Sequence, residues 1–309
     1  MARKLRVEYP GAVYHVLNRG DRGEPIFKDD TDRSRFLQTL GQACEKTGWQ
    51  IHAWCLMENH FHLVIETPKA NLVAGMKWLL GVYTTRFNLR HKLFGHLFSG
   101  RYKALVVDGS GTGYLKTVCD YVHLNPIRAN LVSAEHPLKT FCWSSYSAYL
   151  HKPAKRPPWL RVEKLFGEHG IPRDSAAGRQ HFESRMERQR AIADTGHWRP
   201  MRRGWYLGEE EFRKELLAQM KERRGENHYG QAALETDRQH AETLVQTEIK
   251  KLGWRETDLS RYRKGDTRKA KIAQRLRRET PMTMKWIAHR LKMGTAGSLA
   301  NSLRALEMK

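Results

Sequence analysis

The first half of the chain alternates between short apolar runs and stretches with helical spacing. Apolar and polar residues in strict alternation are typical of half-buried strands, whereas apolar residues three or four apart indicate an amphipathic helix. Phe36, Leu40 and Cys44 have the helical spacing. The patterns predict a strand at 12–18, a helix at 30–46, strands at 49–57 and 59–66, a helix at 71–89, a strand at 103–107 and a helix around residue 121. This order is that of the ferredoxin-like split βαβ fold.

The last part of the chain has the pattern of two short amphipathic helices, 283–291 and 298–306, joined by a glycine-bearing turn. Their apolar residues would form a shared core at Ile287, Leu291, Leu299 and Leu303. The pattern resembles a helix-turn-helix whose recognition helix begins near Ser298. Short helix pairs are common without DNA contact, but the preceding basic helix, 268–278, favours DNA binding. The candidate DNA contacts here are Lys285, Ser298, Asn301 and Arg304.

The composition changes near residue 150. Residues 151–158, His-Lys-Pro-Ala-Lys-Arg-Pro-Pro, are basic and proline-rich, which is typical of a linker or boundary. The sequence therefore predicts three parts: a domain at 1–150, a helical basic linker region at 151–250 and a helix-turn-helix-like domain at 251–309. The expected fold class is α+β, with a mostly helical carboxyl-terminal extension.

The charge balance indicates a partner made of phosphates. The chain has 55 Lys and Arg against 33 Asp and Glu, a net charge of +22. Residues 1–150 hold 19 basic and 12 acidic side chains, and residues 151–309 hold 36 and 21. An excess of this size favours nucleic acid over a membrane surface or a ribosome.

Arginines stand beside aromatic residues between 198 and 206. In this segment Arg202 and Arg203 precede Trp205, and such a cluster could stack bases of single-stranded DNA. Packing of Trp205 into a helical core is the more common fate of such a residue.

Cysteines and apolar runs exclude several classes of protein. The four cysteines, at 44, 55, 119 and 142, fall singly, so neither a zinc ribbon nor a disulfide framework is expected, and we interpret all four as reduced core residues. The amino terminus has no apolar segment of a secretion signal, and no stretch approaches 18 apolar residues. We expect a cytoplasmic protein without a membrane partner.

Two histidines two residues apart, His60 and His62, lie on the predicted strand 59–66. Side chains alternate between the faces of a strand, so both imidazoles point the same way and could bind one divalent cation. The first and third strands of the fold are neighbours, so His15 could lie near this pair. Taken alone, a His-x-His pair is more often structural.

A tyrosine and an asparagine four residues apart form a second group. Within one helix Tyr121 and Asn125 would be neighbours, so a phenol nucleophile would lie beside an amide oxygen able to complete a metal site. Pro126 disfavours helix at the residue before it. The alternative is a tyrosine at the edge of the core, with Asn125 at the end of the helix.

Four segments together resemble the single-tyrosine (Y1) transposases of the IS200/IS605 type and their relatives, the REP-associated tyrosine transposases. Residues 60–62, His-Phe-His, resemble the histidine-hydrophobic-histidine (HUH) motif. Residues 121–129 are similar to the Tyr-x-x-x-Asn-Pro-x-Arg-Ala segment of the REP-associated group, and residues 14–20 and 100–103 also look like that family. The resemblance covers roughly residues 5–150.

This resemblance implies a metal-dependent, single-stranded DNA transesterase. Tyr121 would be the nucleophile, His60 and His62 would be metal ligands, and Asn125 would be the third ligand, where the insertion-sequence enzymes more often carry Gln. The basic residues of the matching segments, Arg19, Arg101, Lys103 and Arg128, are candidate DNA contacts.

The implied enzyme would cleave and rejoin DNA near repeat palindromes through a 5′-phosphotyrosine. The expected partner is a single-stranded hairpin or palindrome, with possible duplex contacts, bound by a monomer or a homodimer. Imidazole and oxygen ligands with open positions suit Mg²⁺ or Mn²⁺. The alternative is a sequence-specific DNA-binding protein or repressor on a catalytically silent transposase scaffold.

Overall fold

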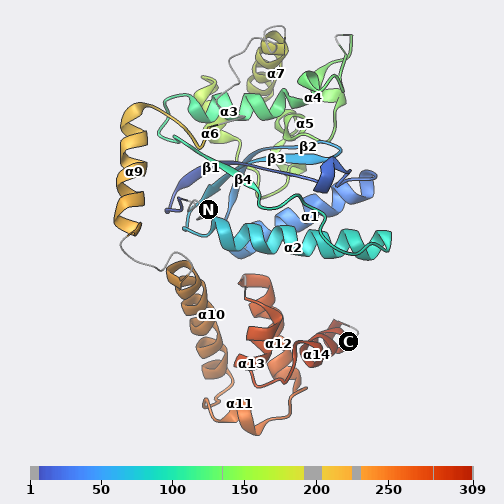
Figure 1. The fold of residues 1–309 in the computed structure, drawn as a ribbon, viewed down its shortest axis with the longest axis vertical. Helices are drawn as coiled ribbons and strands as arrows, with labels where there is room; N and C mark the ends of the chain where they lie inside the picture. The colour runs from blue at the N-terminus through green and yellow to red at the C-terminus, as the bar shows by residue number, and fades with distance from the viewer. Residues whose placement is uncertain (1–6, 134, 191–203, 225–230, 281, 308–309) are drawn as a thin grey trace.

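The computed structural model describes residues 7–133, 135–190, 204–224, 231–280 and 282–307. Within these residues, a five-stranded sheet lies at the centre of the amino-terminal part (Figure 1). Its strands are β1 (Ala12–Arg19), β2 (Gln50–Leu56), β3 (His60–Thr67), β4 (Lys103–Val107) and β5 (Tyr206–Leu207). The order is β2-β3-β1-β4-β5, with antiparallel pairing except between β4 and β5. The first four strands have the predicted ferredoxin-like order, so the predicted α+β fold is confirmed.

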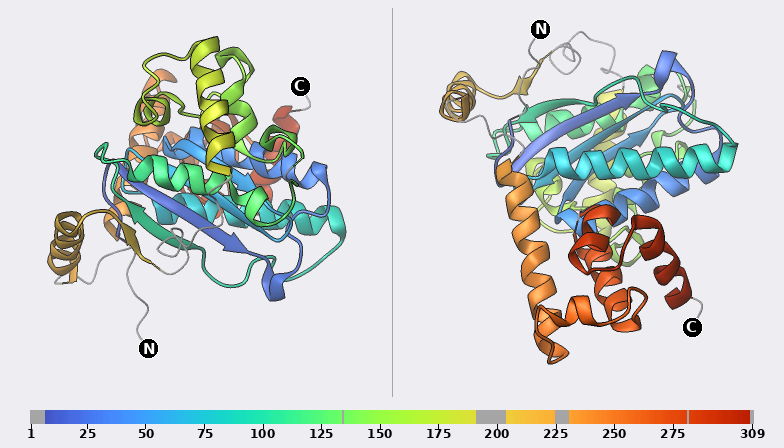
Figure 2. Two further views of the ribbon diagram at one scale, coloured as in Figure 1. Left: turned by 90° about the horizontal axis from the view of Figure 1, so that it is seen from above. Right: turned by 60° about the horizontal axis from the view of Figure 1, so that its bottom comes forward.

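Helices cover both faces of the sheet (Figures 1 and 2). The first face carries α1 (Asp30–Thr47) and α2 (Leu72–His91). The opposite face carries α3 (Tyr114–His123) and α5 (Ser145–Leu150). Phe36 of α1 packs against Phe61 of β3 and Tyr83 of α2, with ring centroids 4.9 and 5.0 Å away. Because Phe61 points toward α1 and α2, its neighbours His60 and His62 point toward α3.

The predicted single helix around Tyr121 is two helices. The first, α3, follows Gly113, whose positive φ of 87° suits glycine, and ends at His123. The second, α4 (Asn125–Arg128), begins after Leu124. Pro126 has no N–H group to continue the ladder of hydrogen bonds, so the helix is interrupted just before it. Tyr121 and Asn125 therefore lie on different helices.

The hydrophobic core of the sheet continues past residue 150. Phe166 of α6 (Glu163–Glu168) and Phe182 of α7 (Ala176–Arg190) pack on Tyr149, with ring centroids 5.5 and 5.2 Å from its ring. Farther along, β5 extends the sheet beside β4, and α9 (Glu210–Arg224) follows it. Short 3-10 helices lie at Asp21–Gly23, Leu138–Thr140 and Pro153–Lys155. The predicted boundaries at 150 and 250 stay predictions.

Two predictions about single residues are wrong. Cys142 is exposed, whereas Cys44, Cys55 and Cys119 are buried as expected. Trp205 is also exposed rather than packed in a helical core. It precedes β5, where its carbonyl accepts a hydrogen bond from the backbone of Val106 (3.0 Å). This pairing at the edge of the sheet leaves the indole outside the core.

The carboxyl-terminal helices have a separate hydrophobic core. They are α10 (Gln231–Lys251), α11 (Asp258–Arg261), α12 (Thr267–Glu279), α13 (Met284–Arg290) and α14 (Ala296–Glu307). The predicted core residues Ile287, Leu291, Leu299 and Leu303 are all buried in it. The turn between α13 and α14 contains Gly294, with φ 86°, so these helices have the predicted helix-turn-helix order. None of the helices in the described residues is long and apolar enough to span a bilayer.

Candidate active site

A pocket of about 710 Å³ opens where β1 ends and β3 begins. Tyr121 and Asn125 line it from α3 and α4, and His60 and His62 line it from β3. Four exposed basic residues complete much of the wall: Arg19, Arg22, Arg101 and Lys103. Of the described residues that line the pocket, none is Asp or Glu. The pocket therefore combines a phenol and two imidazoles with a positive potential, and it favours an anionic ligand such as a phosphate.

The strand register explains why the histidines meet. Residues 60 and 62 share one face of β3, and their ring centroids are 5.1 Å apart. On the neighbouring β1, His15 lies on the same face, and its Nε2 is 2.9 Å from Nδ1 of His62. The expected proximity of His15 to the pair is confirmed. His60 is anchored separately, because its Nδ1 lies 2.8 Å from Oδ1 of Asn59.

Tyr121 is held against this histidine group. The residue is only 5% exposed, and its ring lies edge-on to His15 and His62, with centroid distances of 5.6 and 5.8 Å. On another side, the guanidinium of Arg128 lies 3.9 Å from the centre of the phenol ring and donates a hydrogen bond to the Tyr121 carbonyl. Arg128 therefore contacts the proposed nucleophile itself, which its position in the sequence does not reveal.

Burial keeps the imidazoles neutral. Desolvation, with a contribution from Arg128, lowers the pKa of His15 from 6.5 to about 3. Desolvation and the charge of Arg19 lower the pKa of His60 to about 4. The pKa of His62 is lowered well below 6.5 by desolvation, then by His15, His60 and Arg128. At neutral pH all three rings are therefore uncharged, which is the form that binds a metal ion.

The donor set fits a divalent cation held by three neutral ligands. Hydrogen bonding occupies Nδ1 of both His60 and His62, which leaves each Nε2 as the ligand atom. Asn125 adds an amide, and within the described part of the chain its Nδ2 is buried without a hydrogen-bond partner. Among the described residues no group of three His, Cys, Asp or Glu side chains could hold a metal, so a three-ligand site in this pocket would need the amide oxygen of Asn125.

The structure brings some predicted DNA contacts together and leaves others apart. Arg19, Arg101 and Lys103 line the pocket, whereas Lys285, Ser298, Asn301 and Arg304 are exposed on α13 and α14. Arg202 and Arg203 lie outside the described residues.

The sequence patterns missed several residues of the pocket wall. Arg22, Asn18, Asn59 and Ser99 line the pocket although none was predicted there. Arg22 could have been found from the tight Gly-Asp-Arg-Gly turn that follows β1, because a turn at the end of a strand keeps its residues near that end. Asn18 and Asn59 could have been found because they adjoin Arg19 and His60 in the sequence, whereas Ser99 is placed by the pairing of its segment with the end of β1.

Residues 9–125 match the family model described as "Transposase IS200 like". The resemblance indicated by the motifs is thereby confirmed for this segment. No curated protein matches the chain. Among solved structures, the chain is similar to the REP-associated tyrosine transposase bound to a REP hairpin, at 14% sequence identity and a TM-score of 0.41. That similarity covers 52% of this chain and 91% of the other.

Proposed function

We propose that the pocket is the active site of a transposase-like enzyme that cleaves and rejoins single-stranded DNA. One observation carries the proposal: Tyr121, His60, His62 and Asn125 meet in one pocket whose described lining has four basic residues and no carboxylate. The family match over residues 9–125 supports the same activity. A small anionic metabolite is a weaker candidate, because the chain as a whole carries a net charge of +22.

In the proposed reaction the oxygen of Tyr121 attacks a phosphodiester of the bound strand. A bond forms between this oxygen and phosphorus, the bond from phosphorus to the 3′ oxygen breaks, and the phenol proton leaves as the 3′ oxygen takes up a proton. The products are a 5′-phosphotyrosine and a free 3′-OH. Because the new linkage is still a phosphodiester, attack by a 3′-OH can rejoin the strand without a nucleotide cofactor.

The side chains in and around the pocket have different proposed roles. Arg19, Arg22, Arg101 and Lys103 bind the phosphates on either side of the reacting one. Arg128 fixes the Tyr121 ring, and the two histidines with Asn125 would hold Mg²⁺ or Mn²⁺. When bound, the metal neutralises phosphate charge and orients the leaving oxygen. Since the three ligands are neutral, the charge of the cation is balanced by the DNA itself.

The carboxyl-terminal helices would add contacts to duplex DNA. Ser298, Asn301 and Arg304 lie on one exposed face of α14, at the spacing of a single helical side. Arg290 of α13 takes no part in this, because it pairs with Glu242 and Glu256. We expect the exposed face of α14 to contact the major groove, as recognition helices do.

The test is covalent capture of DNA. Labelled single-stranded DNA with hairpins from the regions flanking the gene of this chain is incubated with the protein, with and without Mn²⁺, and the adduct is resolved on a denaturing gel. Tyr121→Phe should abolish the adduct and leave DNA affinity largely unchanged. His60→Ala, His62→Ala and excess EDTA should each reduce the adduct by several orders of magnitude.

Tyr114→Phe is the matched control. Tyr114 lies two helical turns before Tyr121 on α3, but its hydroxyl donates to Glu209 (2.6 Å) and it does not line the pocket. It should form the adduct at the parent rate. A parent protein that binds the hairpins but forms no adduct under any of these conditions would instead be a DNA-binding protein on a silent scaffold.

A further inference from the structure

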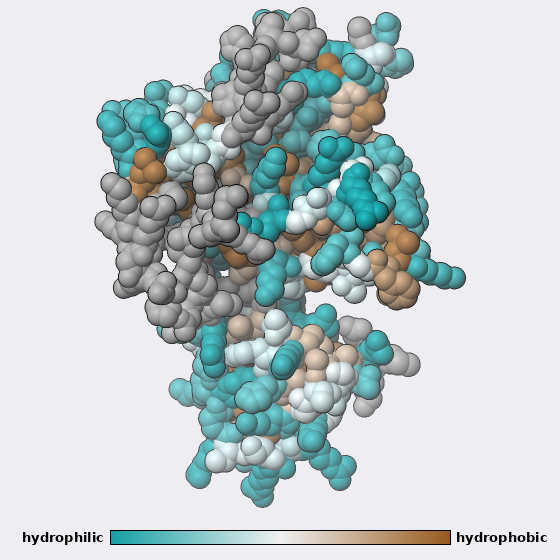
Figure 3. Space-filling view, in the orientation of Figure 1, coloured by the Kyte–Doolittle hydropathy of each residue, from teal (hydrophilic) through white to brown (hydrophobic). Residues whose placement is uncertain are grey.

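An apolar patch lies at the end of α2, next to the loop that leads into the pocket. It consists of Leu89, Leu93 and Phe94, which are 82%, 42% and 98% exposed. Figure 3 shows apolar atoms on this edge of the molecule, near the end of α2. Leu89 and Phe94, which lie almost wholly in water, each forgo about 1.5–3 kcal/mol of burial. A contiguous exposed group of this kind indicates a binding surface more strongly than single exposed residues do.

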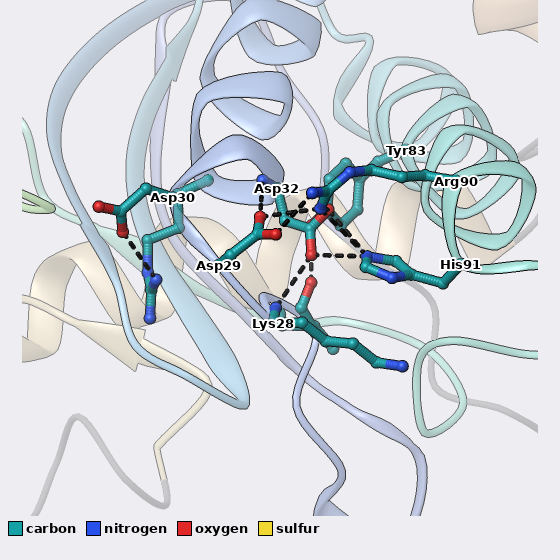
Figure 4. Close-up of polar contacts among 9 residues, drawn as sticks. Lys28, Asp29, Asp30, Asp32, Tyr83, Arg90 and His91 are labelled. Carbon is teal, nitrogen blue, oxygen red and sulfur yellow. Dashed lines mark hydrogen bonds and ion pairs between the residues drawn. The ribbon is translucent and has the colours of Figure 1, made fainter.

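Hydrogen bonds and ion pairs hold the end of α2, which carries the patch, in place. Arg90, within it, donates to Asp29 (2.5 and 2.8 Å) and to the buried Asp32 (2.6 Å), and His91 lies 2.9 Å from Asp32 (Figure 4). This network ties the end of α2 to the start of α1. The turn that follows is closed by hydrogen bonds from Leu93 to the Asn88 carbonyl (2.9 Å) and from the Asn88 side chain to the Gly95 carbonyl (3.0 Å).

The same segment continues directly into the pocket wall. Leu97 and Phe98 are buried, and the backbone of Ser99 donates to the Arg19 carbonyl (2.9 Å). Ser99 itself lines the pocket. Ser99 is five positions after Phe94 in the chain, a reach of at most about 18 Å. That is the length of about five nucleotides of a stacked strand at 3.4 Å each.

The charges around the patch suit DNA. Residues 89–103 contain no Asp or Glu. Arg90 is paired with Asp29 and Asp32, so the cations of this segment that suit phosphates are the exposed Lys92, Arg101 and Lys103. An exposed aromatic ring beside cations is the arrangement on which unpaired bases stack while their phosphates are bound. Duplex DNA could not use it in this way, because its bases are already stacked on one another.

We propose that Phe94, with Leu89 and Leu93 beside it, is a stacking site for unpaired nucleobases of the strand whose phosphates enter the pocket. The inference rests on the proposed function for the identity of that strand. The preference of the protein for single-stranded over duplex DNA then comes from a surface outside the pocket. Anionic lipid and a second copy of the chain are the other possible occupants, and the experiment separates them.

The experiment measures binding of a 20-residue oligothymidine by fluorescence anisotropy, and of the same strand with all of its bases removed. Binding needs no cleavage, so a protein that forms no covalent adduct can still be tested. Phe94→Ala should weaken binding of the intact strand about 10-fold, as expected for one stacked base. On the base-free strand, Phe94→Ala and the parent should bind equally. Phe94→Trp should restore binding of the intact strand.

Val73→Ala is the matched control, since Val73 is also exposed on α2 but at its other end. It should bind both strands as the parent does. Equal loss on both strands after Phe94→Ala, or no loss at all, would overturn the proposal. So would an effect of Phe94→Ala that appears only in binding to vesicles of anionic lipid, or only in the sedimentation mass of the protein without DNA.

Discussion

The contact between His15 and His62 should control metal binding. For Nε2 of His62 to act as a ligand, the proton of this neutral ring must sit on Nδ1 and be donated to Nε2 of His15, 2.9 Å away. The opposite direction of donation would place the proton of His62 on Nε2 and block the ligand position. A metal on Nε2 of His62 therefore requires His15, only 1% exposed, to accept this hydrogen bond, as the outer partner of a metal ligand does.

Replacing His15 with phenylalanine keeps a planar ring in the core but removes the acceptor. The N–H of His62 would then be buried without a partner, which costs about 1–3 kcal/mol. This cost falls on the metal-binding tautomer, so the affinity for the metal should drop by about 5- to 150-fold. The range agrees with the about 10- to 100-fold losses typical when an outer partner of a metal ligand is changed. His15→Gln, which can still accept a hydrogen bond, should recover most of the affinity.

Calorimetric titration of Mn²⁺ into Tyr121→Phe protein saturated with single-stranded DNA measures this affinity without turnover. His52→Phe is the control, because His52 is another buried strand histidine, paired with Glu66 at 2.8 Å and absent from the pocket lining. It should lose stability but not metal affinity. A folded His15→Phe protein that binds Mn²⁺ as tightly as its parent would refute the tautomer argument.

Three further predictions concern the nucleophile, pH and the carboxyl-terminal part. Arg128→Met should slow adduct formation about 10-fold at saturating DNA, because it removes the cation–π contact and the hydrogen bond that hold Tyr121. A change in DNA affinity alone would contradict this. The free energy of unfolding, measured with urea, should fall as the pH is lowered from 6.5 to 4.5, because burial lowers the pKa of His15 and His123 in the folded protein to about 3 and protons then bind the unfolded chain preferentially. Each ring contributes at most about 2.7 kcal/mol to this fall. A flat profile would show that these rings are not buried in the neutral form. Truncation after Arg224, which keeps β5 and the buried Leu216 and removes 18 basic and 10 acidic side chains, should flatten the salt dependence of DNA binding but leave the adduct rate at saturating DNA comparable. An unchanged salt slope would mean that the removed charges only face solvent.

The truncation point follows from the core rather than from composition. A cut near residue 150, where the composition changes, would remove Phe166 and Phe182 from their contacts with Tyr149. The proline-rich segment at 151–158 also packs, because Arg156 donates to the carbonyls of Ala148 and Tyr149 (3.0 and 3.1 Å) and pairs with Asp174 (2.5 Å). The composition of a segment indicates its exposure and charge, but it does not indicate which side chains after residue 150 pack into the core of the residues before it.

The sheet was predictable because its signals are local. Strand β4 was predicted at its observed bounds, and β1 and β3 differ from their predictions by one residue. Alternation placed His60 and His62 on one face, and the order of the elements placed His15 beside them. In each case a pattern within one segment, combined with a known strand order, was sufficient.

The remaining features of the site depend on contacts between segments. The cation–π contact of Arg128 with Tyr121 joins two helices, α3 and α4, that are separated at Leu124. The two-residue strand β5 is too short to give an alternating pattern, and it exists because the edge of β4 offers hydrogen-bond partners. Tertiary pairing of this kind leaves little trace in a single sequence.

The arrangement of the two faces limits what the carboxyl-terminal helices can do. The pocket lies on the side of the sheet that faces α3, whereas α12 packs beside α1 on the opposite side (Figure 1), where Lys46 donates to the Thr280 carbonyl (3.3 Å). The sheet and at least one helix layer, about 10 Å thick, therefore separate α12 from the pocket. In this arrangement, DNA bound to α14 has to pass around the edge of the sheet to reach Tyr121. In the proposed function the carboxyl-terminal helices would raise affinity and choose the site, while the chemistry would depend on residues of the sheet and of α3 and α4.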